Sequence, residues 1–127
     1  IIGGGVMLDL CSFAASTYKR GIAFTLVPST LLAMVDASHG GKNGFNNNYG
    51  KNQIGTFNLP KCVIACFELL NTLKDKDYKD GLIELLKHGL IGSKEIFDKL
   101  VSTENFKILQ GDQLIIYHGR LLHHLQP

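Results

Sequence analysis

The sequence has no tryptophan, only three prolines and only three cysteines among its 127 residues. Cys11, Cys62 and Cys66 form no C-x-x-C pair, and their number is odd. Neither a disulfide framework nor a zinc site made of thiolates is therefore expected. A reduced, cytoplasmic protein is the simplest interpretation of this cysteine content.

Long apolar runs are absent as well. No stretch of about 18 consecutive apolar residues occurs, so we expect no membrane span. Residues 1–8 have neither a basic start nor a small-residue cleavage site, unlike a secretory signal peptide, and the missing initial Met suggests a chain that begins within a fold. The net charge of +2 is small and no block of like charge occurs, which argues against a nucleic-acid partner.

Glycine and asparagine are abundant in one place. Residues 40–55 hold five glycines, five asparagines and two lysines. Glycine lets a backbone approach another group closely, and asparagine and lysine supply hydrogen-bond donors. The segment is too polar for a core element, so we expect either a solvated loop or a loop that wraps a polar, probably anionic, ligand.

The first half of the chain alternates predicted strands and helices. Residues 1–21 predict a strand end, a glycine turn and a helix, and residues 21–28 predict a buried strand that ends at Pro28. Residues 29–38 predict a short helix with Ser29 or Thr30 as its cap, and residues 61–67 predict another buried strand. This alternation is typical of a parallel α/β sheet.

The pattern changes after Lys74. Three helices without strands between them are predicted: one over 74–89 with Asp77 as a possible cap, one over 93–101 with Ser93 as cap, and one over 111–126. We therefore expect two units. Residues 1–74 would belong to an α/β domain, and residues 75–127 would be the first helices of an α-helical domain.

Several segments carry candidate chemistry with two readings each. The run GGGVMLD at residues 3–9 is either a structural turn or a site where a pyrophosphate meets a helix N-terminus, although it is not a G-x-G-x-x-G motif. Ser29 and Thr30 are either plain helix caps or hydroxyls beside a ligand at the end of a strand. Asp36 is either another cap or a site residue next to the glycine-rich segment.

Basic side chains show the same ambiguity. Lys42, Lys51 and Asn52 are either solvated or positioned to hold a phosphate or carboxylate. Arg20 could donate to the same kind of group through both arms of its guanidinium.

Glu84 lies in an otherwise apolar helical run, GLIELLKHG, where a buried carboxylate is costly unless it is paired or bound to metal. Lys87 at i+3 and His88 at i+4 share its side of the helix. Glu84 is thus either half of a surface Glu–Lys pair or a metal ligand with Lys87 reaching into the same site. His118, His123 and His124 are spaced five and six residues apart, which does not put two imidazoles on one helical face, so they are read as ordinary histidines.

Three stretches together resemble the 3-dehydroquinate synthase family. They are GGGVMLDLCSFAASTYKRGI, LVPSTLLAMVDASHGGKNGFNNNYGKNQIGTF and YKDGLIELLKHGLI, in the family's order over roughly the first 92 residues. The combination GGK…GKN…IG-F is more specific than any one part.

The resemblance implies an incomplete parallel, Rossmann-like NAD-binding sheet followed by the start of an all-α metal-binding domain. The family uses NAD and a divalent metal, zinc or cobalt, and its substrate lies between the two domains. It converts 3-deoxy-D-arabino-heptulosonate 7-phosphate, a sugar phosphate, into 3-dehydroquinate and phosphate in the shikimate pathway. A homodimer of the full-length enzyme is also implied.

The resemblance implies residue roles position by position. Catalytic or substrate-contacting positions are Asp36, Lys42, Asn52, Lys87 and Arg20, the last reaching the substrate phosphate across a dimer interface. NAD-contacting positions are Gly5, Val6, Met7, Leu8, Asp9, Ser29, Thr30, Lys42, Lys51, Leu69, Leu70, Asn71 and Thr72. Glu84 matches the metal-binding glutamate.

There are departures from the family pattern. Leu8 replaces a usual glycine, so the turn near the pyrophosphate is expected to be tighter or shifted. The family chain is longer at both ends, and His118, His123 and His124 do not match its two metal-binding histidines, which leaves Glu84 as a lone ligand. A related sugar-phosphate cyclase with another substrate, or a non-catalytic fragment, remains an alternative. A polyol dehydrogenase is disfavoured by the GGK…GKN pair.

Overall fold

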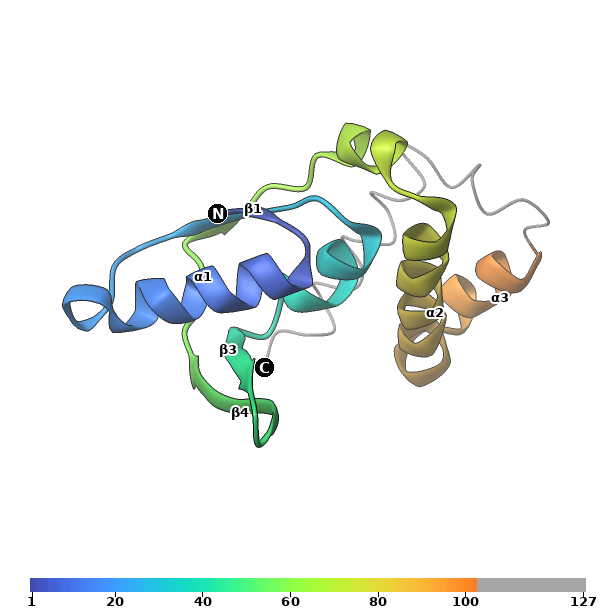
Figure 1. The fold of residues 1–127 in the computed structure, drawn as a ribbon. Coiled ribbons are helices and arrows are strands. Elements are labelled where there is room, and N and C mark those ends of the chain that lie inside the picture. Colours follow the sequence, from blue (N-terminus) through green and yellow to red (C-terminus); the bar gives the residue numbers. More distant parts are fainter. Residues whose placement is uncertain (103–127) are drawn as a thin grey trace.

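The computed structural model describes residues 1–102. The elements in chain order are β1 (Ile2–Gly3), α1 (Gly5–Thr17), η1 (Tyr18–Arg20), β2 (Thr25–Pro28), η2 (Ala33–Ala37), β3 (Lys42–Asn47), β4 (Gly50–Phe57), β5 (Cys62–Val63), η3 (Phe67–Thr72), α2 (Asp75–Gly92) and α3 (Lys94–Ser102). Helix α1 lies beside the short strands, the β3–β4 hairpin extends below it, and α2 and α3 form a separate layer (Figure 1).

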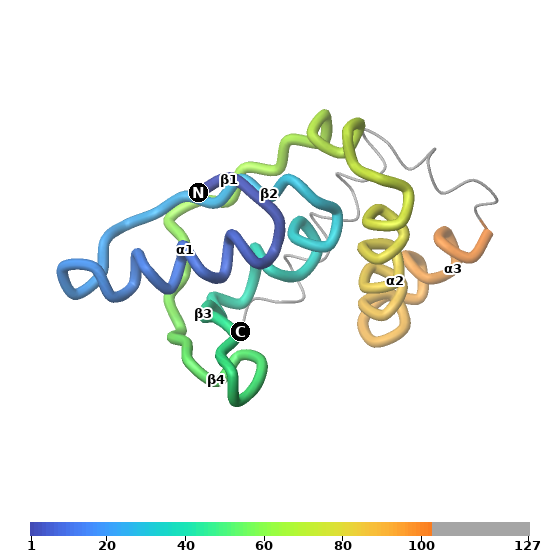
Figure 2. The backbone as a smooth tube through the Cα atoms, viewed as in Figure 1, coloured from blue at the N-terminus to red at the C-terminus, as the bar shows by residue number. Residues whose placement is uncertain are grey.

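Strands β1, β2 and β5 form a parallel sheet in the order β1-β2-β5. Ile2 pairs with Val27 and Gly3 with Pro28, so β1 and β2 run side by side and end together (Figure 2). A glycine turn leads directly from β1 into α1. The strand–turn–helix start, the end of β2 at Pro28 and the parallel α/β fold were all predicted from the sequence, and the structure confirms them.

Strand β5 differs from its prediction. The buried strand expected over 61–67 is reduced to Cys62–Val63, which pairs with β2 at an edge of this sheet within the described residues. Cys62 is exposed and Ile64 is 52% exposed, while Val63 packs against the core. An edge strand has one partner, so an apolar run such as CVIAC need not be buried.

The glycine- and asparagine-rich segment is a hairpin, contrary to the expected loop. Strand β3 pairs antiparallel with β4, from Lys42 opposite Phe57 to Asn47 opposite Gly50. Asn47 Oδ1 accepts hydrogen bonds from the backbone N–H groups of Tyr49 and Gly50, at 2.9 and 3.1 Å, and so shapes the turn. The asparagines therefore build the hairpin from their side chains.

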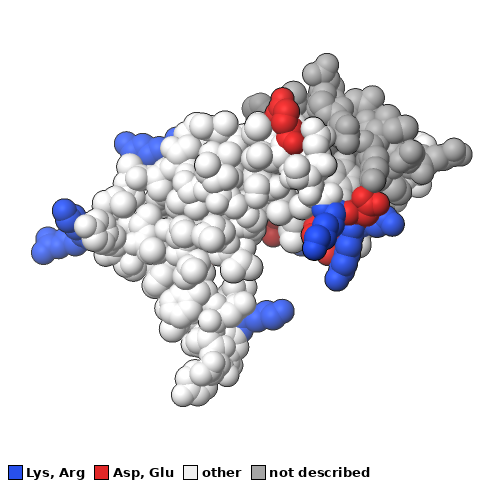
Figure 3. All heavy atoms as spheres, turned by 45° about the horizontal axis from the view of Figure 1, so that its top comes forward, with Lys and Arg blue, Asp and Glu red and all other residues white. Residues whose placement is uncertain are grey.

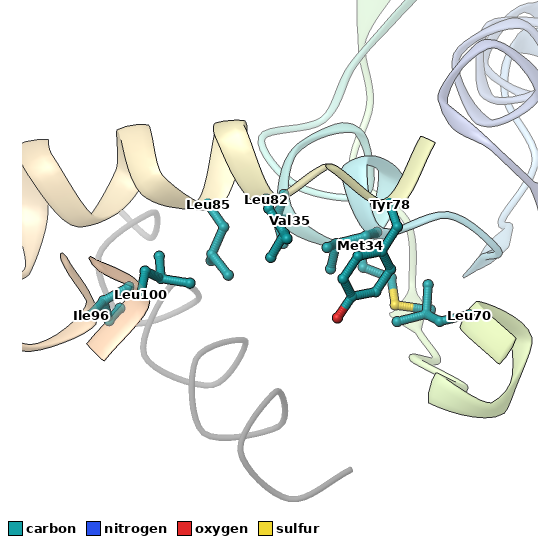
Figure 4. Packing of buried hydrophobic residues seen from close by; sticks show 9 residues of the cluster. Met34, Val35, Leu70, Tyr78, Leu82, Leu85, Ile96 and Leu100 are labelled. Carbon is teal, nitrogen blue, oxygen red and sulfur yellow. The ribbon is translucent and has the colours of Figure 1, made fainter. Parts of the chain in front are cut away.

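Two clusters of buried side chains form the core. One lies under the parallel sheet and includes Leu8, Phe24 and Leu26. The other joins α2 and α3 to η2 and η3, and Figure 4 shows Leu82 and Leu85 of α2 pointing toward the same interior as Met34. The helical layer is thereby fixed to η2. The domain boundary after residue 74 stays a prediction.

The predicted helices over 74–89 and 93–101 are present as α2 and α3. Asp77 was proposed as a cap, but α2 begins at Asp75 with Lys74 at the cap position, so Asp77 lies in the first turn, where its charge suits the helix dipole. Ser93 Oγ accepts from Ile96 N–H at 3.5 Å, near the limit for a cap. The third predicted helix and His118, His123 and His124 lie outside the described residues.

Charged side chains are distributed unevenly. On the face in Figure 3 they gather at the end where α2 lies and at the opposite tip where η1 lies, and the surface between is largely uncharged. Within residues 1–102, no helix has the length and apolar character that crossing a membrane requires.

Candidate functional site

The glycine turn and the Ser29–Thr30 pair meet at the carboxyl edge of the sheet. Gly3 and Pro28 are register partners, and Ser29 N–H donates to Gly3 O at 2.9 Å. A Cβ on Gly4 would lie 3.2 Å from Thr30 Cγ2, so the two segments are in close approach. Ligands of open parallel sheets bind at this edge. The two segments that the resemblance assigns to NAD are therefore neighbours.

The start of α1 is open to a ligand. No side chain caps the helix at Gly4, so its first amides are not bonded by a capping residue. Val6 is 81% exposed and Met7 is half exposed, whereas Leu8 is buried in the core. Leu8 can therefore contact a cofactor through its backbone, not its side chain. Thr30 Oγ1 accepts from Ala33 N–H at 3.1 Å, which confirms the predicted cap.

A cavity of about 410 Å³ lies between α1, η2 and the hairpin. Four predicted site residues line it: Asp9, Asp36, Lys42 and Asn52. They come from three separate parts of the chain, and the hairpin supplies the last two. The fold therefore assembles these residues around one space, as a shared ligand requires.

Other predicted residues lie elsewhere. Arg20 lines a second cavity of about 490 Å³ beside Lys61. Lys51 is exposed on β4, and the segment Leu69–Thr72 lies on η3 with Leu70 buried in the core. Neither cavity includes Lys51 or this segment. Their assignments to NAD stay predictions.

Asn43 and Thr56 were missed from the sequence. Asn43 is buried, and its Nδ2 donates to Gly41 O at 3.2 Å. Thr56 Oγ1 lies 2.5 Å from Asn43 Oδ1 and 2.8 Å from Ser16 Oγ, which ties the hairpin to α1. Both residues line the cavity. In a run of five asparagines, nothing distinguishes the buried one.

His39 was also missed, and it lines the same cavity. Its Nε2 lies 2.9 Å from Met34 O and 3.3 Å from Ser38 Oγ. Burial lowers the pKa of His39, opposed by the hydrogen bond to Met34 and the charge of Asp36. This imidazole contacts the backbone of the π-helical turn η2, which carries Asp36. Such turns are frequent at functional sites.

Glu84 lies in a mixed cluster. Lys87 Nζ is 2.6 Å from Glu84 Oε1, and His88 Nε2 is 3.6 Å from the same oxygen. The carboxylate raises the pKa of Lys87 through this hydrogen bond and its charge. One ligand atom each of Asp36, Glu84 and His88 lies within 4.8 Å of the others. Glu84 was expected to be a lone ligand, but the fold brings two further donors to it.

These donors fit a divalent metal chemically. Carboxylate oxygen and imidazole nitrogen bind zinc at about 2.0–2.2 Å, so ligand atoms around one ion are roughly 3–4 Å apart. Atoms within 4.8 Å reach that spacing through small side-chain rotations. Both readings of Glu84 therefore have support, because the Glu–Lys pair exists beside a possible metal site.

Asp9 gives a test of the electrostatics in the cavity. Burial raises its pKa above the ordinary 3.8, and the charge of Asp36 adds to this. The neutral form therefore favours the fold below pH 3.8, and this stability is lost as the pH rises through the folded-state pKa. Since Asp9 is partly solvated, we expect Asp9→Asn to raise the melting temperature at pH 7 by only about 1–3 °C.

The gain should shrink as the pH falls toward 3.8. Differential scanning calorimetry across this range measures it, with exposed Asp80→Asn as the control. An equal gain at all pH values, or a loss at pH 7, would contradict the electrostatic account.

Comparison with known proteins follows the same lines. A sequence model described as 3-dehydroquinate synthase N-terminal matches residues 1–80. The 3-dehydroquinate synthase of Prochlorococcus marinus is 49% identical over 104 residues, 82% of this chain and 28% of that protein. The enzyme of Leptospira interrogans is 47% identical over 114 residues, 90% of this chain and 31% of that protein. The chain thus spans about a third or less of these relatives.

Solved structures resemble it too. A 2-epi-5-epi-valiolone synthase from Streptomyces hygroscopicus, with NAD+ and Zn2+ bound, has a TM-score of 0.87 at 31% identity, covering 96% of this chain and 35% of that one. A 2-deoxy-scyllo-inosose synthase complexed with carbaglucose-6-phosphate, NAD+ and Co2+ has a TM-score of 0.68 at 36% identity, covering 71% and 25%.

Proposed function

Because the chain belongs to the 3-dehydroquinate synthase family, we propose that it forms the NAD-binding part and the first helices of the metal-binding part of a 3-dehydroquinate synthase. The proposed reaction converts 3-deoxy-D-arabino-heptulosonate 7-phosphate into 3-dehydroquinate and phosphate. One observation carries the proposal: Asp9, Asp36, Lys42 and Asn52, which are distant in sequence, line one cavity.

NAD would lie at the carboxyl edge of the parallel sheet. The uncapped first amides of α1, in Gly5 and Val6, suit a pyrophosphate because they point partial positive charge at it. Ser29 and Thr30 would supply hydroxyls from the neighbouring strand end. When bound, NAD takes a hydride from a substrate alcohol and later returns it.

The substrate would occupy the cavity beside the hairpin. Lys42 and Asn52 would donate to its oxygens and hold it against the cofactor. Asp36 would accept a hydrogen bond from a substrate hydroxyl, and Lys87 would bind an anionic group from the α2 side. Arg20 lies apart from this cavity, in keeping with a role toward the substrate of a second subunit.

Glu84 would hold a divalent metal at the same site. When bound, such an ion polarises a hydroxyl or ketone of the substrate. Lys87 already pairs with Glu84, so a positive charge at this carboxylate is compatible with the local structure.

A related sugar-phosphate cyclase is the second candidate. The TM-score of 0.87 to a 2-epi-5-epi-valiolone synthase favours it, because the shared fold does not select one substrate. Sequence identity favours the first candidate, at 49% against 31%.

Phosphate release distinguishes the candidates. The 127-residue chain and the longest polypeptide that its gene encodes would be assayed with NAD, Zn2+ or Co2+, and either 3-deoxy-D-arabino-heptulosonate 7-phosphate or glucose 6-phosphate. We expect release from the heptulosonate by the longer polypeptide. Release from glucose 6-phosphate alone would support the second candidate, and no release by folded protein would refute both.

Lys42 provides a sharper test. We expect Lys42→Met to lower kcat/KM for phosphate release about 100-fold in the longer polypeptide, since a charged donor to a developing anion is lost. Lys76→Met removes an equivalent charge from the exposed first turn of α2 and should change kcat/KM less than twofold. Equal effects of the two substitutions would argue for a general charge effect, and no loss in Lys42→Met would remove Lys42 from the site.

A further inference from the structure

We propose that Asp36, Glu84 and His88 together form a three-ligand divalent-metal site contained within this chain. The family resemblance assigns Glu84 alone among them to the metal. The inference deepens the proposed function and rests on it only for the metal's role in the reaction. Binding itself can be tested without turnover.

The first argument is the shared helix face. Glu84 and His88 are four residues apart on α2, so their side chains project from the same side one turn apart. Their ligand atoms are 3.6 Å apart, close to the separation of two ligands on one zinc ion. Their side chains are only 19% and 18% exposed, which limits competition from water.

The second argument is the His88 nitrogen. Its Nε2 is buried and has no hydrogen-bond partner among the described residues. A buried polar atom without a partner costs free energy, so such atoms in a native structure call for an explanation. A metal ion between Nε2 and the Glu84 carboxylate would supply the missing interaction.

The third argument is the approach of η2. Asp36 belongs to the π-helical turn, and its carboxylate joins the two α2 ligands within 4.8 Å. Gly81, one turn before Glu84, allows this approach, because a Cβ there would lie 2.6 Å from Leu32 N. The third ligand therefore comes from an element held rigidly against α2.

Lys87 is the competing cation. Its ammonium is 2.6 Å from Glu84 Oε1, and its side chain is 59% exposed, so it can turn toward solvent or substrate when metal binds. The carboxylate keeps a positive partner in both states. Two oxygens and one imidazole nitrogen suit Zn2+ or Co2+, with further positions left for water or substrate.

Cobalt titration tests the site. Co2+ would be added to the 127-residue chain, and to the longest polypeptide of its gene, while visible absorption and calorimetry report binding. We expect one equivalent to bind. His88→Gln and Glu84→Gln should each weaken the affinity at least tenfold, and circular dichroism checks that each variant is folded. The matched control is His118→Gln/His123→Gln/His124→Gln, which removes three other imidazoles and should leave the affinity unchanged.

Three outcomes would overturn the proposal: no Co2+ binding by folded protein, unchanged affinity in His88→Gln, or loss of binding in the triple control. X-ray absorption of the zinc-loaded wild-type chain is independent of any variant. It should show one imidazole nitrogen with oxygen ligands, and a spectrum with no imidazole or with several would refute the ligand set. Normal metal binding without phosphate release would refute the proposed function and leave the metal site standing.

Discussion

Gly81→Ala is expected to destabilise the protein by about 1–3 kcal/mol and to weaken metal binding, because it forces α2 away from η2. A Cβ at this position would lie 2.6 Å from the backbone nitrogen of Leu32 and 2.7 Å from Leu31 Cβ. Leu31 is completely buried, so neither neighbour can move aside alone. Separating the two elements pulls Asp36 away from Glu84. Chemical denaturation and Co2+ titration measure the two effects.

Gly92 is the matched control on the same helix. A Cβ there would meet nothing within 4 Å, so Gly92→Ala should be neutral or stabilising by up to about 1 kcal/mol, through helix propensity alone. If Gly81→Ala is as stable as Gly92→Ala, the close approach of α2 to η2 is not what holds the helical layer in place.

Gly55→Ala is expected to disrupt the β3–β4 hairpin and lower kcat/KM at least tenfold in the longer polypeptide. A Cβ on Gly55 would collide with the carbonyl oxygen of Asn43, and one on Gly44 would collide with that of Ile54. These two glycines are directly opposite each other, so the strands approach more closely than side chains permit. Relieving the collision costs about 1–3 kcal/mol and shifts Lys42 and Asn52, which line the cavity.

Tyr49→Ser in the hairpin turn controls for general sensitivity of the hairpin. Tyr49 is 92% exposed, so its replacement should change the free energy of unfolding by less than about 0.5 kcal/mol. Kinetics of phosphate release and thermal melts compare the two variants. Wild-type kinetics in Gly55→Ala would show that the hairpin does not position substrate-binding groups.

The strand–turn–helix at the N-terminus could be predicted because its signals are local. Three consecutive glycines mark the turn, and Pro28 marks the end of β2. The resemblance then supplied Asp36, Lys42 and Asn52, which the fold brings to one cavity. Here the local pattern and the tertiary structure agree.

The hairpin could not be predicted, because its stability depends on interactions that polarity conceals. Strands are usually recognised by alternating apolar residues, yet here Asn46 and Asn47 bond the opposing backbone and the turn. Asn52 adopts a left-handed conformation, with φ at 55°, which asparagine tolerates better than most residues. Composition alone therefore indicated a loop.

The position of His88 was also beyond the sequence. Its helical partnership with Glu84 follows from the spacing of four residues, but its approach to Asp36 depends on the packing of α2 on η2. The same holds for His39, whose hydrogen bond to Met34 O depends on the π-helical turn. Such contacts are tertiary, so a single sequence gives no signal for them.

The two sheets differ in how far apart their partners lie along the chain, and this sets an order of folding events. Asn47 pairs with Gly50 in the hairpin, whereas β1 pairs Ile2 with Val27, and β2 pairs Thr25 with Cys62. Hairpins close in about 1–10 μs, while contacts between distant segments must first overcome the entropy of closing long loops. The substrate-facing hairpin is therefore expected to form early. The parallel edge assigned to NAD completes late, so ligands at that edge act on the last step of folding.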